Sequence, residues 1–134
     1  MSADQALILI VDDDFDFLEI NRIILEGAGH RVVTATNPTE ALARIDAETP
    51  DLVITDLMMT SIDAGFAFSA QLKEDPRTAA VPIIISTSVS SALGLNFQPD
   101  SADDLAKMNV DAYFDKPIDA QTLLAKIAEL LGAA

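Results

Sequence analysis

Short apolar segments recur along the chain and are separated by longer stretches with the spacing of amphipathic helices. The apolar segments lie at residues 6–11, 31–35, 51–55, 82–86 and 111–114. The first, third and fourth are almost continuously apolar and rich in Val and Ile. Such runs are typical of strands that are buried on both faces of a parallel sheet.

The stretches between these segments carry signals for helix starts and ends. The first predicted helix has an apolar face made of Phe17, Ile20, Ile24 and Ala28, and ends at Gly27 or Gly29. Asn37 stands three residues before Glu40, a variant of the capping box that predicts a second helix. Residues 66–74 predict a third helix, and Asp119 is expected to cap a last one at 120–131.

Strand and helix therefore alternate along the whole chain. This order predicts an α/β fold with a doubly wound, five-stranded parallel sheet and helices on both faces. The flavodoxin-like strand order 2-1-3-4-5 is the expected one. We expect a single domain over residues 1–134 with a core at about 6–131. The segment at about 88–100 predicts an extended loop before a short helix that Ser101 caps.

Composition narrows the possible partners. The chain has 134 residues with 22 acidic and 8 basic side chains, a formal net charge of −14. Such a charge disfavours direct binding to nucleic acid and anionic lipid, because both require cations that neutralise phosphate. Cysteine is absent, which excludes disulfides and thiolate metal sites. No apolar run approaches the ~18 residues of a membrane span. We expect no membrane insertion and a cytoplasmic location.

Polar side chains gather where the predicted strands end. They are Asp12, Asp13 and Asp14, then Asp56, then Ser86, Thr87 and Ser88, and finally Asp115 and Lys116, which Pro117 follows. The carboxyl ends of parallel strands form one edge, where ligands of such sheets bind. Clustered carboxylates favour a hard cation such as Mg²⁺. An ammonium and a hydroxyl beside it suit a phosphoryl group, and a carboxylate can act as its nucleophile.

Four motifs at these positions occur together in a known family. They read ILIVDD at 8–13, TDLMM at 55–59, PIIIST at 82–87 and YFDKP at 113–117. With them the chain resembles, over nearly its whole length, the receiver domains of two-component response regulators, either stand-alone or excised from a longer protein. Receiver domains are regulatory. They catalyse only the transfer of a phosphoryl group to themselves and the slow loss of that group by hydrolysis.

The resemblance implies a role for each acidic residue of the edge. Asp56 is the phosphoacceptor, which takes phosphoryl from the phosphohistidine of a histidine kinase or a histidine-phosphotransfer protein. Asp13 binds Mg²⁺ directly and Asp12 through water, together with Asp56 and the backbone carbonyl of Met58. Phosphorylation then switches a surface that binds a downstream protein target.

The resemblance also implies roles for the remaining strand-end residues. Thr87 bonds the phosphoryl group and Lys116 pairs with it. Thr87 and Tyr113 form the switch, in which the aromatic ring turns inward when the hydroxyl moves. The peptide bond between Lys116 and Pro117 is expected to be cis.

Other residues of the acidic run have simpler interpretations. Asp14 and Asp16 are expected to cap the first helix and to favour its N-terminal dipole. His30 is interpreted as a turn residue. Met58 and Val89, two residues beyond Asp56 and Thr87, offer no polar group to orient an attacking water. We therefore expect slow intrinsic loss of phosphate.

Two alternative functions remain open. The loops after the third and fourth predicted strands depart from the family pattern, with Thr60 at a position that usually holds proline. A degenerate receiver that works as a phosphorylation-independent docking module is therefore one alternative. The other is a small hydrolase of the haloacid-dehalogenase type with Asp12 as nucleophile. Asp16 disfavours it, because that class has Thr or Val at this position.

Overall fold

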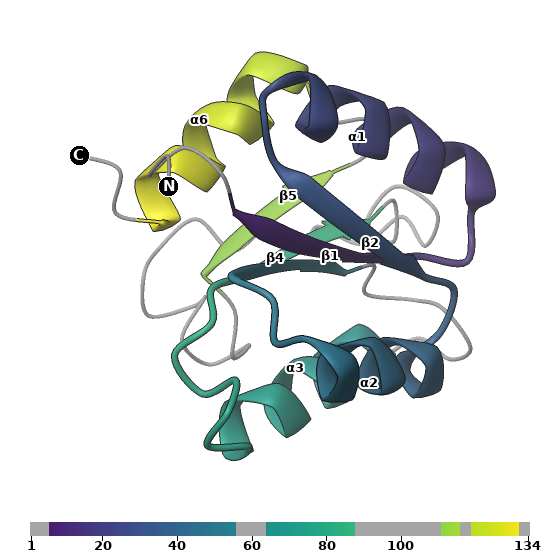
Figure 1. Ribbon diagram of the computed structural model, residues 1–134, viewed down its shortest axis with the longest axis vertical. Helices are drawn as coiled ribbons and strands as arrows, with labels where there is room; N and C mark the ends of the chain where they lie inside the picture. The colour runs from purple at the N-terminus through teal and green to yellow at the C-terminus, as the bar shows by residue number, and fades with distance from the viewer. Residues whose placement is uncertain (1–5, 56–63, 88–110, 116–118, 132–134) are drawn as a thin grey trace.

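The computed structural model describes residues 6–55, 64–87, 111–115 and 119–131, and strands and helices alternate within each of the longer of these ranges (Figure 1). The elements are β1 (Leu7–Val11), α1 (Phe15–Gly27), β2 (Arg31–Ala35), α2 (Pro38–Ala47), β3 (Leu52–Thr55), α3 (Ala64–Glu74), β4 (Ile83–Thr87), β5 (Ala112–Asp115) and α6 (Ala120–Leu130). The loop expected at 88–100 and the helix expected after Ser101 lie outside the described residues.

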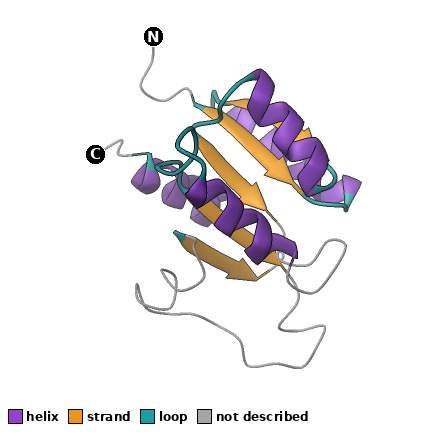
Figure 2. Cartoon of the chain, turned by 90° about the horizontal axis from the view of Figure 1, so that it is seen from below, coloured by secondary structure: helices purple, strands orange, loops and turns teal. Residues whose placement is uncertain are grey.

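The strands form one sheet in the order β2-β1-β3-β4-β5, and each neighbouring pair is parallel. The predicted α/β fold with a parallel sheet and its 2-1-3-4 order is confirmed, and β5 pairs with β4 at the far side. Helices α1 and α6 lie on one face and α2 and α3 on the other (Figures 1 and 2). None of the described helices is long and apolar enough to span a membrane.

The alternation of side chains along each central strand fills two separate cores. In β1, Ile8 and Ile10 belong to the core under α1 and α6, while Leu9 and Val11 belong to the core under α2 and α3. All four side chains are fully buried. This double burial explains why the strand reads as a continuous apolar run, and it makes β1 a rigid support for the residues that follow it.

Side chains hold the backbone together at the amino ends of the strands. Asp51 donates its N–H to the carbonyl of Leu7 at 2.7 Å and accepts the N–H of Leu7 at its carboxylate at 2.8 Å. Asp111 repeats this arrangement with Ile83, at 2.8 Å in both directions. Each aspartate therefore fixes the register between the strand it precedes and the neighbouring strand.

In the other two strand pairs, different groups bond the backbone at the amino ends of the strands. Nδ1 of His30 accepts the N–H of Ala6 at 3.2 Å, while Arg31 donates its N–H to the carbonyl of Ala6. His30 is thus more than a turn residue. Between β3 and β4, the carbonyl of Pro82 accepts the N–H of Val53 at 3.0 Å. Pro82 has no N–H of its own, so no side-chain acceptor is needed there.

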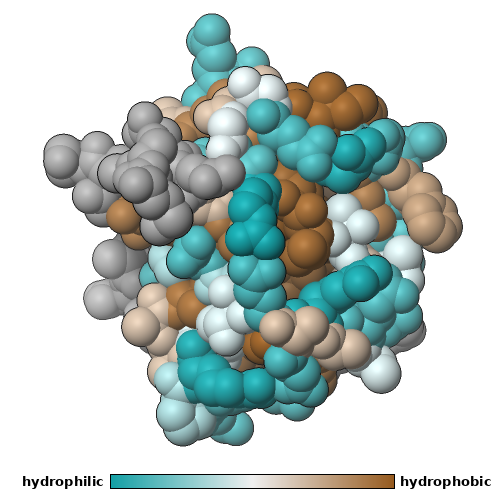
Figure 3. Space-filling view, in the orientation of Figure 1, coloured by the Kyte–Doolittle hydropathy of each residue, from teal (hydrophilic) through white to brown (hydrophobic). Residues whose placement is uncertain are grey.

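Helix α1 buries the predicted face only in part, because Phe17 packs against the core and Ile24 is half-buried. Its buried residues are Leu18, Asn21 and Leu25, whereas Ile20 is 58% exposed. The prediction was wrong for Ile20, because a polar residue belongs to the buried stripe: Asn21 satisfies its amide by donating to the carbonyl of Phe17 at 2.8 Å. Figure 3 shows the resulting apolar surface over α1 and at the sheet edge between α1 and α2.

The helix ends follow the sequence signals. Asn37 accepts the N–H of Glu40 at 2.8 Å, which confirms the predicted cap of α2. After α1, Gly29 has φ of 98° and donates its N–H to the carbonyl of Glu26. His30 then donates to the carbonyl of Leu25, which completes the Schellman type of helix end. This turn sets the start of β2.

Candidate functional site at the carboxyl edge of the sheet

The carboxyl ends of β1, β3, β4 and β5 meet at one edge of the sheet. Val11 pairs with Thr55, the last residue of β3. Thr55 also pairs with Ile85 of β4, and Thr87 at the carboxyl end of β4 pairs with Asp115, the last residue of β5. The chain therefore leaves these strands at neighbouring points, which is the geometry that collects ligand-binding residues in an open parallel sheet.

Among the carboxylates of this edge whose side chains the structure describes, Asp12 is the most buried. It directly follows β1 and is only 1% exposed. Its N–H donates to the carbonyl of Ala35 at 3.0 Å, and its Oδ1 accepts the N–H of Asp14 at 2.9 Å. The first bond fixes the backbone of Asp12 against β2, and the second holds its carboxylate. A charged group buried to this extent requires compensation by hydrogen bonds or cations.

The neighbouring acids divide between the edge and the helix. Asp13 is exposed at the edge. Asp14 caps α1, because its Oδ1 accepts the N–H groups of Asp16 at 3.0 Å and Phe17 at 3.3 Å. Asp16 lies in the first turn, where its charge favours the helix dipole. The predicted roles of Asp14 and Asp16 are confirmed. Of these four aspartates, Asp12 and Asp13 therefore remain as candidates for binding a ligand at the edge.

The structure describes the remaining predicted site residues only in part. Thr87 is the last residue of β4, and Tyr113 lies in β5 opposite Ile85. Their backbones are in the sheet, whereas their side chains are outside the described part. The other predicted members of the site also lie outside the described residues: Asp56, Met58, Lys116 and Pro117.

The described part of the edge fits a hard cation in its chemistry. Asp12 and Asp13 supply carboxylate oxygens, the donors that Mg²⁺ prefers. Within the described ranges no three acidic or histidine side chains gather closely enough to hold a metal. Asp56, the third expected carboxylate, falls outside those ranges. The oxygen donors of Asp12 and Asp13 are therefore compatible with Mg²⁺.

Sequence reasoning grouped Ser86 with the strand-end hydroxyls but gave it no role. The residue is fully buried, and in the part of the chain that the structure describes its Oγ has no hydrogen-bond partner. The only available signal was a polar residue in an otherwise apolar strand. The aspartates at the strand starts, Asp51 and Asp111, were not recognised as structural residues either.

A family model described as the response regulator receiver domain matches residues 8–128. The chain belongs to the response regulator receiver domain family. It is therefore similar to regulatory domains of two-component signalling. Its relatives include protein PilH of Pseudomonas aeruginosa, which is 33% identical over 130 residues that cover 95% of this chain and 98% of PilH.

Solved structures of receiver proteins agree with this assignment. The chemotaxis response regulator CheY4 of Vibrio cholerae has a TM-score of 0.78 and 25% identity, covering 94% of this chain and 98% of that one. A CheY-like receiver domain protein from Methanospirillum hungatei has a TM-score of 0.75 and 28% identity, covering 95% and 94%.

Some relatives are much longer than this receiver domain. The match to the DNA-binding dual master transcriptional regulator RpaA of Synechocystis, 33% identical over 124 residues, covers 92% of this chain but 48% of RpaA. The match to the transcriptional regulatory protein ZraR of Klebsiella oxytoca, 32% identical, covers 27% of ZraR. The receiver domain is what this chain shares with these regulators.

Proposed function

We propose that this receiver domain is switched by phosphorylation of Asp56. The observation that carries the proposal is the meeting of four strand ends at one edge, with the carboxylate of Asp12 buried there and Asp13 exposed beside it. Asp56 is the next residue after β3, the strand between β1 and β4. The motifs at the ends of β1, β4 and β5 resemble those of receiver domains, and the family match spans them.

The proposed reaction is transfer of a phosphoryl group from a phosphohistidine. A carboxylate oxygen of Asp56 forms a bond to phosphorus while the phosphorus–nitrogen bond breaks. The imidazole leaves with the electron pair, and the product is an aspartyl phosphate. Little covalent chemistry falls to the protein, so orientation and charge compensation supply most of the catalysis.

Asp12, Asp13, Asp56 and the carbonyl of Met58 would hold Mg²⁺. When bound, the cation supplies positive charge that offsets the charge of the phosphoryl and carboxylate oxygens. The contacts of Asp12 support this role, because the bond to Ala35 fixes its backbone and the N–H of Asp14 orients its carboxylate before any ligand arrives.

The remaining residues would bind the phosphoryl group and transmit its presence. Lys116 supplies a point charge and Thr87 a hydroxyl. The Thr87–Tyr113 switch then changes the populations of two surface conformations. The cis peptide expected between Lys116 and Pro117 stays a prediction.

The proposed partners are proteins. A histidine kinase or a histidine-phosphotransfer protein donates phosphoryl, and a downstream protein binds the switched surface. The net charge of −14 supports protein partners over direct contact with DNA. The DNA binding that the name of RpaA states belongs to that longer protein. The cytoplasmic location stays a prediction.

The test is Mg²⁺-dependent labelling with radioactive acetyl phosphate. The wild-type chain and Asp46→Asn, which removes an exposed carboxylate on α2, should incorporate label equally. Asp56→Asn should incorporate none. Label that persists at the wild-type level in Asp56→Asn would exclude Asp56 as the acceptor. NMR spectra unchanged by beryllofluoride, a phosphoryl mimic, would instead support the phosphorylation-independent docking module.

A further inference from the structure

Ser86 carries a buried hydroxyl that the described contacts leave unused. Its side chain is fully buried near the end of β4, and within the described residues its Oγ is the one buried side-chain polar atom without a hydrogen-bond partner. Such a group loses its hydrogen bonds to water and gains none in return. Thr78 shows the usual arrangement, because its buried hydroxyl donates to the carbonyl of Leu72 at 2.6 Å.

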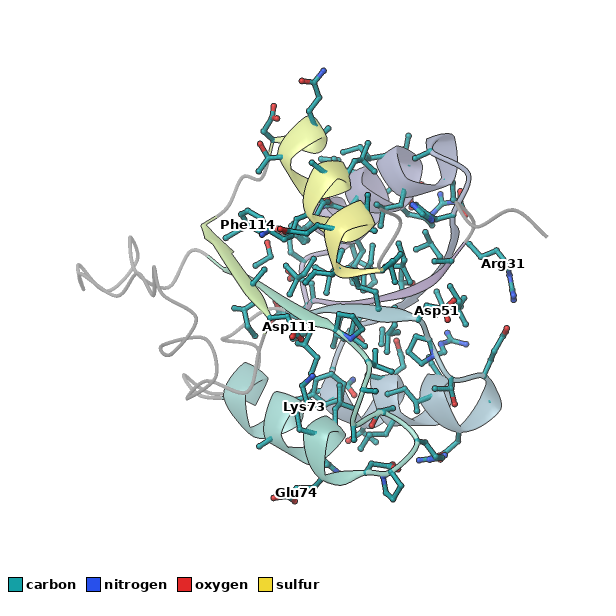
Figure 4. The ribbon with its side chains drawn as sticks, turned by 90° about the vertical axis from the view of Figure 1, so that its left-hand side faces the viewer. Arg31, Asp51, Lys73, Glu74, Asp111 and Phe114 are labelled. Carbon is teal, nitrogen blue, oxygen red and sulfur yellow. The ribbon has the colours of Figure 1, made fainter. Side chains whose placement is uncertain are left out.

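The hydroxyl lies on the sheet face that α1 and α6 cover. Ile84, two residues earlier, belongs to the core on this face, and side chains alternate along a strand. On β5, Ser86 pairs with Phe114, which packs against the same core (Figure 4). An aromatic hydrocarbon side chain has no oxygen or nitrogen to offer. The neighbour on the β5 side therefore leaves the hydroxyl without a strong partner.

On the other side of β4 lies β3, whose last residue sets the register of the edge. Thr55 pairs with Ile85, so the next residues along the two strands are Asp56 and Ser86. Asp12 holds the equivalent place after β1, because Val11 pairs with Thr55. The unused hydroxyl thus belongs to the same row of strand-end positions as the carboxylates of the proposed site.

We propose that Ser86 is a positioning residue of this site, whose hydroxyl donates a hydrogen bond to an oxygen of the phosphorylated Asp56 side chain. The inference rests on the proposed function. A hydrogen bond that forms only in the loaded site favours that state selectively, because the unloaded chain gains nothing from it. Ser86 then shifts the equilibrium toward the loaded state instead of strengthening both states equally.

The test compares ligand-induced stabilisation in matched variants. Thermal midpoints are measured with and without Mg²⁺ and beryllofluoride for wild type, Ser86→Ala and Thr78→Val. Ser86→Ala should retain or raise the midpoint of the unloaded chain, while its affinity for beryllofluoride falls by about tenfold, the worth of one such hydrogen bond. Thr78→Val removes a buried hydroxyl that has a partner, so it should lower both midpoints and leave the shift unchanged. Ser86→Thr, which restores the hydroxyl, should restore the shift.

Each other result counts against the inference. Equal shifts in wild type and Ser86→Ala would show that the hydroxyl does not act in the loaded site. A lower midpoint of unloaded Ser86→Ala would show that the hydroxyl already has a partner without ligand. A wild-type chain that does not respond to beryllofluoride would overturn the proposed function as well, which separates the two failures.

Discussion

At the scale of single residues, backbone groups at the strand starts depend on side chains that are distant in the sequence. Asp51 and Leu7 are separated by 44 residues, and His30 and Ala6 by 24. Neither contact has a local motif, so sequence reasoning did not find them. Asp14 and Asn37 were predicted as caps because their partners lie within three residues. A contact could therefore be predicted when its two residues lie close together along the chain, and could not when they lie far apart.

The contact of Asp51 gives a direct prediction for stability. Asp51→Ala removes the acceptor of the buried Leu7 N–H and should lower the free energy of unfolding by about 1 kcal/mol. Asp51→Asn keeps an oxygen acceptor at the same position and should retain most of that stability. Urea denaturation measures both changes. Equal losses in the two variants would show that the negative charge matters and the acceptor does not.

A second residue-scale prediction concerns the lifetime of the phosphorylated state. Because Met58 and Val89 offer no polar group to orient water, we expect slow hydrolysis of the aspartyl phosphate. Met58→Asn should shorten the lifetime, whereas Met59→Asn, one residue further, should not. The decay of label after removal of acetyl phosphate measures this. A wild-type half-life of seconds would contradict the prediction.

At the scale of elements, α1 shows where hydrophobic pattern succeeds and where it fails. Its existence and its glycine end were predicted, because caps and glycines act locally. Its buried face was predicted only in part, because Asn21 in the buried stripe satisfies its amide within the helix while Ile20 remains exposed. A pattern based only on hydrophobicity does not predict the burial of a polar side chain that donates to a carbonyl of its own helix.

The two glycines at the end of α1 should respond in opposite directions to substitution by alanine. Gly29 has φ of 98°, so Gly29→Ala forces a side chain into the left-handed region and should cost about 1–2 kcal/mol. Gly27 has helical backbone and no atom within 4 Å of an added Cβ, so Gly27→Ala should stabilise by about 0.5 kcal/mol. Denaturation curves of both variants test the pair, and a common sign would refute this account of the helix end.

At the scale of the whole molecule, the alternation of strand and helix was enough to predict the parallel sheet and its 2-1-3-4 order. The same topology gathers the strand ends, so the edge that carries the candidate site could also be predicted. The burial of Asp12 could not, since it depends on contacts with the end of β2 and the start of α1. Composition gives the net charge of the whole chain, −14.

That charge makes two effects of Mg²⁺ coincide, and the last prediction separates them. Any salt screens the repulsion among the acidic groups and should raise the thermal midpoint. Specific binding should add to this at constant ionic strength, by about 1.4 kcal/mol when Mg²⁺ is at ten times its dissociation constant. Asp13→Asn should lose the specific part. Asp16→Asn removes the same charge three residues away and should keep the specific part of the stabilisation. Equal responses of the two variants would show that Mg²⁺ acts only by screening.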